Sequence, residues 1–125
     1  NKYKMEFESH KSIYLQIADN ICNQILKGEL EQGKRAPSVR NLAVELEVNR
    51  NTVMRTFTYL QNEKVLINKR GVGFFVAEDA IEKILENEKN TFFNKELPYF
   101  IERIQLLKLN TIDLQKLITS IKNND

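Results

Sequence analysis

Tryptophan is absent from this 125-residue chain, cysteine and histidine each occur once, and glycine occurs only four times. The single cysteine, Cys22, excludes an intramolecular disulfide, and His10 is too distant in the sequence to suggest a metal-ligand spacing. No apolar run approaches the ~18 residues that a membrane span needs, and the first ten residues lack the apolar core of a secretory signal. We therefore expect a cytoplasmic protein with no metal, no cofactor and no membrane contact.

The composition, 42% hydrophobic and 29% charged, is that of a globular protein with one modest domain or a small domain plus an appendage. The net charge is only +2, but residues 34–70 carry eight basic and three acidic side chains. Residues 1–33 carry four and five, and residues 71–125 carry seven and nine. A polyanion is expected to dock on the basic segment. A basic face that merely meets solvent stays the alternative.

After Ser12, apolar residues recur at three- and four-residue steps, which predicts a helix that stops at Gly28. Its apolar stripe contains Tyr14, Ile17, Ala18, Ile21, Cys22, Ile25 and Leu26. Within that stripe we interpret Cys22 as a small buried hydrophobe rather than a reactive thiol. The next stretch, "GELEQGKRAPS", has two glycines and a proline without a period and predicts a connecting loop.

Two short helices follow, each with a polar residue placed to cap it. Ser38 precedes a helix whose apolar face is Val39, Leu42, Ala43 and Leu46. After a two-residue link, Asn49 precedes a helix whose apolar face is Val53, Phe57 and Leu60, with Met54 left open. Because the link is so short, the helices must cross steeply and the second must present its first turn outward.

The next stretch behaves as a β-hairpin: residues 65–67 and 74–76 are β-prone, and residues 70–73 hold two glycines. Lys69 and Arg70 lie at its rim. Helical spacing then returns, with Asp79 as the expected cap and Pro98 as a point where the helix should kink or be interrupted. It resumes over residues 100–109, and Asn110 with Asp113 resembles a capping box that opens a final helix.

The last forty-odd residues are rich in Ile, Leu and Phe, yet too few to close a core of their own, so their apolar surface needs a partner. The expected dimerisation residues are Ile84, Leu85, Phe92, Phe93, Phe100, Ile104, Leu107, Leu114, Leu117 and Ile118. A small effector pocket at the dimer seam could instead be lined by Phe92, Phe93, Tyr99 and Phe100. We favour the interpretation that these aromatic side chains form part of the core of the dimer interface.

Catalysis has no support, because no nucleophile has a base in reach and no glycine-rich phosphate cradle opens a helix. A helix–turn–helix that binds DNA explains more features of the sequence than catalysis does. An α-helix fits the major groove, and its N-terminal residues reach base edges. Residues 49–52 occupy that turn, where arginine can pair with guanine and asparagine with adenine, each contact contributing roughly 1–3 kcal/mol of discrimination. Arg40, Lys69 and Arg70 suit phosphates.

Three stretches, "IYLQIADNICNQILKGEL", "GKRAPSVRNLAVELEVNRNTVMRTFTYLQ" and "KRGVGFFV", closely resemble the winged helix–turn–helix domain of GntR family regulators, from about residue 13 to 76. The tail, with "ELPYFIERIQLLKLN", is similar to the YtrA subfamily. The resemblance implies a mainly α fold, with three helices and a β-hairpin wing in residues 1–77 and two or three dimerising helices in residues 78–125. It also implies a homodimeric, repressor-like regulator.

With the resemblance, the expected DNA-binding residues are Ser38, Arg40, Asn49, Arg50, Asn51, Thr52, Arg55, Lys69, Arg70 and Gly71. Three departures stand out. The family's arginine after Thr-Val is Met54 here, and Arg55 lies about 100° further round the helix. The wing's usual Lys and Thr are Val72 and Phe74. Two usual glycines are Lys64 and Lys108, and a left-handed backbone there would cost ~1 kcal/mol each.

Two-fold symmetry in such a dimer predicts an inverted-repeat operator in double-stranded DNA, with half-sites ~34 Å apart. The rival hypothesis is a winged-helix module that binds another protein through the same surface, favoured by the low overall charge. Retention on heparin or random duplex DNA at low salt separates the two. The sequence leaves open whether a small-molecule effector exists.

Overall fold

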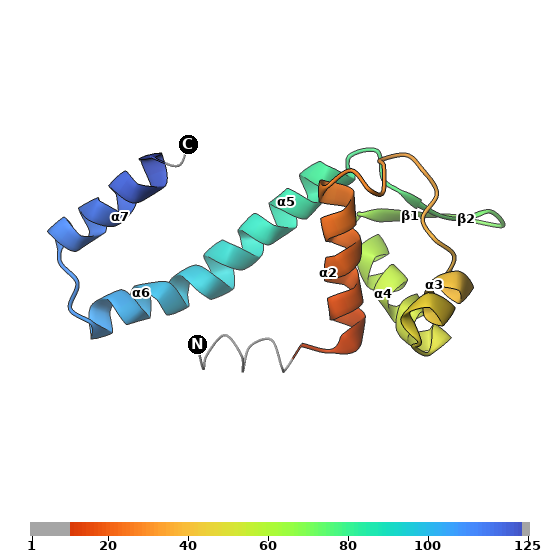
Figure 1. Ribbon diagram of the computed structural model, residues 1–125, viewed down its shortest axis with the longest axis horizontal. Helices are drawn as coiled ribbons and strands as arrows, with labels where there is room; N and C mark the ends of the chain where they lie inside the picture. Colours follow the sequence, from red (N-terminus) through yellow and green to blue (C-terminus); the bar gives the residue numbers. More distant parts are fainter. Residues whose placement is uncertain (1–10, 124–125) are drawn as a thin grey trace. The chain divides into compact units, whose positions relative to one another are not determined.

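The computed structural model describes residues 11–123, so His10 and the rest of the first ten residues lie outside it. The chain divides into two compact units, one ending at Asn87 and the other beginning at Glu88. We call the first unit the head. In chain order (Figure 1), the elements are α2 (Ile13–Leu26), α3 (Val39–Leu46), α4 (Arg50–Asn62), β1 (Leu66–Lys69), β2 (Gly73–Val76), α5 (Ala80–Thr91), a π-helical segment (Phe92–Glu96), α6 (Leu97–Leu106) and α7 (Thr111–Asn123).

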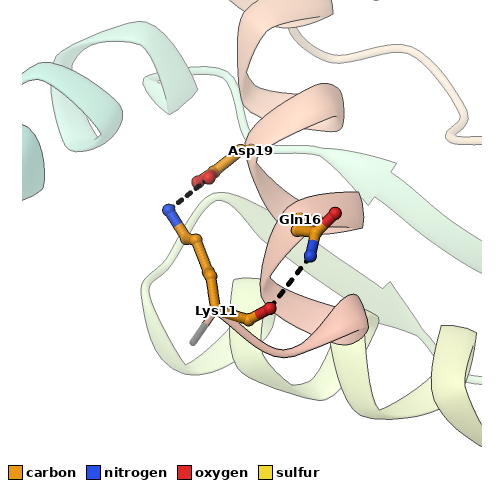
Figure 2. Close-up of polar contacts among 3 residues, drawn as sticks. All are labelled: Lys11, Gln16 and Asp19. Carbon is orange, nitrogen blue, oxygen red and sulfur yellow. Dashed lines mark hydrogen bonds and ion pairs between the residues drawn. The ribbon is translucent and has the colours of Figure 1, made fainter. Parts of the chain in front are cut away.

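Side-chain contacts fix the beginning of α2, as Figure 2 shows. The ammonium group of Lys11 pairs with the carboxylate of Asp19. The side-chain amide of Gln16 donates a hydrogen bond of 2.9 Å to the carbonyl oxygen of Lys11. At the other end the helix stops before Gly28, whose φ of +82° is the left-handed conformation that glycine adopts without steric cost. The predicted helix and its stop are confirmed.

The core of the head lies where α2, α4, the hairpin and the first part of α5 meet. Phe57 of α4 is fully buried, and its ring meets the ring of Phe74 edge-on with centroids 5.0 Å apart. Thr56 is also fully buried, and its hydroxyl is satisfied because it donates a 2.7 Å hydrogen bond to the carbonyl oxygen of Tyr14. This bond ties α4 to the first turn of α2.

Of the stripe predicted on α2, the buried members are Ile17, Ala18, Ile21 and Ile25, and the other three differ. Tyr14 is half-buried. Cys22 is only partly buried, packed at the margin of the cluster. Leu26 is exposed, because Ile25 occupies the core position of that last turn. On α4, Val53 and Leu60 are buried as expected, whereas Met54 points outward and is 44% exposed.

The hairpin pairs Leu66 with Val76 and Lys69 with Gly73, so β1 runs two residues further than expected. Residues 33–36, predicted as a connecting loop, add antiparallel pairing along β2. The amides of Gly33 and Ala36 each donate 2.8 Å hydrogen bonds to this strand, and residue 35 forms an isolated bridge with Phe75. The pairing partners are about forty residues apart in sequence, so local pattern carries no signal for this contact.

The beginning of α5 is held by a residue from the loop before α3. The backbone amide of Ile81 donates a 2.9 Å hydrogen bond to the side-chain oxygen of Gln32. The sequence assigned this capping to Asp79, whose carbonyl oxygen accepts the first intrahelical bond, from Lys83. The helix therefore begins where predicted, and a distant amide satisfies one of its unpaired N–H groups.

Ile84, one of the expected dimerisation residues, is buried in the head instead. Its side chain is 2% exposed and belongs, with Ala80, to the core of the head. Both are one turn apart on α5, and their burial makes the first half of this helix part of the head. The two compact units divide after Asn87, ten residues beyond the domain boundary expected after residue 77, which stays a prediction.

Pro98 interrupts the α-helix, as predicted, but the chain does not leave the helical path. A π-helical segment over residues 92–96 comes first, and the amide of Leu97 bonds to the carbonyl oxygen of Phe92, five residues back. Pro98 then falls in the first turn of α6, directly after this widened turn. Proline has no N–H to continue the α-helical hydrogen bonds, which explains the local change of helix type.

A reciprocal capping box opens α7. The amide of Asp113 donates to Oδ1 of Asn110 at 2.9 Å, and the amide of Asn110 donates to Oδ2 of Asp113 at 3.1 Å. The residue that ends the preceding turn, Lys108, has a φ of +53°, and Lys64 after α4 has a φ of +65°. Both left-handed positions, expected from the family's glycines, are confirmed.

From residue 88 to residue 123 no side chain is buried. The expected dimerisation residues other than Ile84 are therefore partly or largely open to solvent: Leu85, Phe92, Phe93, Phe100, Ile104, Leu107, Leu114, Leu117 and Ile118. A helical segment with this many apolar side chains and no interior has its hydrophobic surface unpaired within the chain.

Candidate nucleic-acid interface

The link between α3 and α4 is made by Glu47 and Val48. Glu47 is left-handed, with φ of +55°, and its amide and that of Val48 bond back to carbonyl oxygens of α3. Val48 then packs against the core. The left-handed residue ends α3, and the side chain of the next residue anchors the turn. Only three residues therefore separate the end of α3 from the start of α4.

The first turn of α4 is fixed by Asn49. Its side-chain oxygen accepts a 2.7 Å hydrogen bond from the amide of Asn51, as expected of a cap. Arg50 and Asn51 are exposed, while Thr52 is half-buried. The helix end therefore offers a guanidinium and a carboxamide to solvent on a backbone that the cap holds rigid.

Arg55 has a partner within the chain that the sequence did not indicate. Its guanidinium lies 4.0 Å from the centroid of the Tyr14 ring, a cation–π contact between α4 and α2. The Tyr14 ring in turn meets Tyr59 edge-on, with centroids 6.2 Å apart. Burial raises the pKa of the Tyr59 phenol, and the nearby carboxylate of Glu63 raises it further. Arg55 remains exposed at its other face.

Ser38 caps α3, because its hydroxyl oxygen accepts a 3.0 Å hydrogen bond from the amide of Asn41. A serine hydroxyl has one proton and two lone pairs, so the cap bond leaves the proton and one lone pair for other contacts. Arg40, one residue into α3, is exposed. It carries a positive charge near the start of the helix that precedes α4.

The tip of the wing, which we define as residues 69–73, is a tight turn in which the amide of Val72 bonds to the carbonyl oxygen of Lys69 at 2.9 Å. Gly71 has φ of +80° and open space where a side chain would be. The ammonium group of Lys69 lies 4.1 Å from the centroid of the Phe75 ring. Arg70 and Gly71 are exposed at the turn itself.

Arg35 is the residue that sequence reasoning missed. Its Nη2 donates a 2.6 Å hydrogen bond to the carbonyl oxygen of Val72, and its guanidinium lies so close to Gly73 that an added Cβ would be 3.1 Å from Nη2. The residue was counted only as one charge of the basic segment. Its role depends on the pairing of residues 33–36 with β2, which only the fold reveals.

The basic segment keeps its charge available. Across the described part of the chain, the ion pairs join Lys11 to Asp19 and Lys83 to Glu86. Both lie outside residues 34–70, so no carboxylate of residues 11–123 forms an ion pair with the cations of that segment. Exposed cations that have not lost their hydration are the groups that exchange counterions with a polyanion.

The described helices include none that is long and apolar enough to cross a membrane. Within residues 11–123, histidine, cysteine and acidic side chains do not gather into a group of three that could bind a metal ion.

The sequence pattern of the family described as "Bacterial regulatory proteins, gntR family" matches residues 13–76, which run from the start of α2 to the end of β2. The chain belongs to the GntR family. The match covers the three helices and the hairpin, and so includes the whole basic segment, residues 34–70.

Two GntR-type relatives come from Bacillus subtilis. The HTH-type transcriptional regulator YhcF is 36% identical over 104 residues, which cover 83% of this chain and 84% of YhcF. The HTH-type transcriptional repressor YtrA is 33% identical over 93 residues, which cover 74% of this chain and 71% of YtrA. Among solved structures, a GntR family transcriptional regulator from Bacteroides thetaiotaomicron is 42% identical, with a TM-score of 0.78 over 91% of this chain and 100% of its own.

Membership in the GntR family confirms the predicted fold: a mainly helical chain with a winged helix–turn–helix formed by α2, α3, α4 and the hairpin. It also confirms the predicted class of function, a DNA-binding transcription regulator rather than an enzyme. The similarity to YtrA expected from the tail is confirmed as well.

Proposed function

We propose that this GntR family member is a homodimeric repressor that binds an inverted-repeat operator, with α4 in the major groove and the wing tip against the adjacent backbone. One observation carries the proposal. Arg50 and Asn51 are exposed side by side in a first turn that Asn49 caps, and no hydrogen bond or ion pair within the described residues occupies their side chains. Recognition helices of this fold read bases from that turn.

The chemistry of each side chain assigns it a partner. Arg50 suits the O6 and N7 acceptors of guanine, and Asn51 suits the N6 and N7 pair of adenine. Exposed Arg40 and Arg70 suit phosphates, from the start of α3 and from the wing tip. Lys69 holds its charge near the same tip, over the Phe75 ring. The phosphate contacts would set the register in which Arg50 and Asn51 meet the bases.

Self-association is the second part of the proposal. Residues 88–123 have no buried side chain but carry exposed Phe, Leu and Ile on successive helices, and a second copy of the same segment would cover them. A two-fold axis would pair two recognition helices and place the half-sites ~34 Å apart. YtrA, the similar protein named as a repressor, supports repression as the outcome. Because such a regulator acts on DNA inside the cell, the proposal includes a cytoplasmic location.

Arg50→Ala tests the major-groove assignment. The operator is first recovered by selecting bound fragments from random duplexes, and affinities are then measured by gel shift. We expect the variant to lose about 1–3 kcal/mol of specific binding per half-site while binding random DNA nearly as before. Lys27→Ala is the matched control, since it removes one exposed positive charge from the head outside residues 34–70. Equal affinity of Arg50→Ala and the parent for the operator would overturn the assignment.

Salt dependence separates DNA binding from the rival protein-interaction module. If Arg40, Arg70 and their symmetry mates contact phosphates, affinity must fall steeply with salt, because each neutralised phosphate releases counterions. Arg40→Ala and Arg70→Ala should each make the slope of log K against log salt shallower by about 1 per contact. Failure to be retained on random duplex DNA or heparin at low salt would favour the rival module.

A further inference from the structure

Met54 is an apolar side chain on the face of α4 that the proposed function turns toward DNA. Val53, Phe57 and Leu60 form the buried side of this helix, but Met54 is 44% exposed. The sequence alone left its side open. A large exposed hydrophobe on an otherwise polar recognition surface is informative, because the neighbouring exposed positions of the first turn are Arg50 and Asn51.

The helical geometry places Met54 between those two residues. It lies four residues after Arg50 and three after Asn51, so in projection it is about 40° from the first and about 60° from the second. Helical side chains lean toward the N-terminus, so the Met54 thioether covers the turn from which both polar side chains emerge. Arg55, the next residue, is instead directed to the Tyr14 ring.

We infer that Met54 determines specificity by contacting the C5-methyl group of a thymine, at a base pair next to those read by Arg50 and Asn51. The inference rests on the proposed function. Thymine is the only base that presents a methyl group in the major groove, and apolar side chains recognise it there. A thioether has the polarisability and the rotatable bonds to pack on such a group.

The test uses 2′-deoxyuridine, which differs from thymidine only by the missing C5-methyl group. Each thymine of the selected operator is replaced singly in one half-site, and affinity for the intact protein is measured by fluorescence anisotropy. We expect one position to weaken binding about fourfold, the value that burial of one methyl group gives. Replacing the symmetry-related thymine as well should bring the loss to about fifteenfold, since distant sites add.

Variants assign this effect to Met54. Met54→Ala should bind the thymine and uracil duplexes equally at that position, whereas Met54→Leu, which keeps an apolar side chain of similar size, should retain most of the discrimination. Leu26→Ala is the matched control, because Leu26 is a half-exposed apolar residue of the head outside the recognition face. It should keep the full sensitivity. Circular dichroism of each variant establishes that the head is folded.

The outcomes distinguish this inference from the proposed function. If the protein selects an operator but no thymine is sensitive to loss of its methyl group, the inference fails and the function stands. It fails equally if Met54→Ala keeps the fourfold sensitivity. If no duplex is preferred over random DNA, the proposed function fails and the inference fails with it.

Discussion

The guanidinium of Arg35 donates a 2.6 Å hydrogen bond to the carbonyl oxygen of Val72 and thereby joins the loop before α3 to the wing tip. The guanidinium also lies against Gly73, where an added Cβ would be 3.1 Å from Nη2 of Arg35 and where φ is +139°. The loop that leads into α3 and the turn that carries Arg70 are therefore joined by a direct hydrogen bond.

Arg35→Ala should loosen the wing without unfolding the head. Arg35 is exposed and contributes nothing to the core, so stability should change by no more than about 1 kcal/mol. The amide of Val72 should exchange with solvent faster, while buried amides of α4 keep their protection. Arg35→Lys separates geometry from charge: it keeps the positive charge but lacks the planar fork. If the Val72 amide exchanges at the same rate in Arg35→Ala as in the parent, Arg35 does not stabilise the wing tip.

Lys64→Gly should stabilise the head by up to about 1 kcal/mol. Lys64 has φ of +65°, a conformation that costs a residue with a Cβ about that much, and glycine adopts it freely. Lys27→Gly is the control, because Lys27 ends α2 in the right-handed conformation with φ of −84° and should lose stability instead. Urea unfolding followed by circular dichroism gives both values. A loss of stability in Lys64→Gly would contradict the strain argument.

Ile118→Asp should convert the proposed dimer into a monomer while the head stays folded. Ile118 is exposed in α7 and belongs to no buried core of its own chain, so a carboxylate there should change the free energy of folding little. Burying that carboxylate in a dimer interface would cost much more free energy. Sedimentation equilibrium measures the change. Ser120→Asp places the same charge two residues away and should leave association intact. Dimers of Ile118→Asp as stable as the parent would show that α7 does not form the interface.

Tyr59 should make stability fall in alkaline solution. An unfolded tyrosine ionises near pH 10, and burial raises the pKa of Tyr59 in the folded protein. Between the pKa of the unfolded state and that of the folded state, unfolding releases a proton from Tyr59. The contribution of Tyr59 to the free energy of unfolding is therefore complete below about pH 10, and it is lost as the pH rises through the pKa of the folded state. Tyr59→Phe should lose less stability than the parent between pH 9 and pH 11, by thermal unfolding. Absorbance of tyrosinate in the native protein should show a late-ionising component that is absent from Tyr59→Phe.

Local pattern predicted the elements well wherever a few neighbouring residues decide the structure. Ser38 and Asn49 cap the helices that follow them, and Asn110 and Asp113 form the reciprocal box that their three-residue spacing indicates. Each of these hydrogen bonds joins residues within one helical turn, so the residues that form it are near neighbours in the sequence. The exposure of Arg50 and Asn51 follows from the same short link and cap.

The contacts between distant segments were decided by the fold. Nothing near Arg35 in the sequence indicates Val72, and nothing near Gln32 indicates the amide of Ile81 that it caps. Nothing near Arg55 in the sequence indicates Tyr14, and only the packing of α4 on α2 brings the guanidinium over that ring.

The sequence by itself determined the family, the order of helices and hairpin, and the polar turn that opens α4, because periodicity, caps and glycines act over a few residues. Only the tertiary structure decided that Ile84 lies inside the head and Met54 outside it. Both residues fit an apolar stripe equally well, and the side on which each falls depends on which elements, far apart along the chain, pack against its helix.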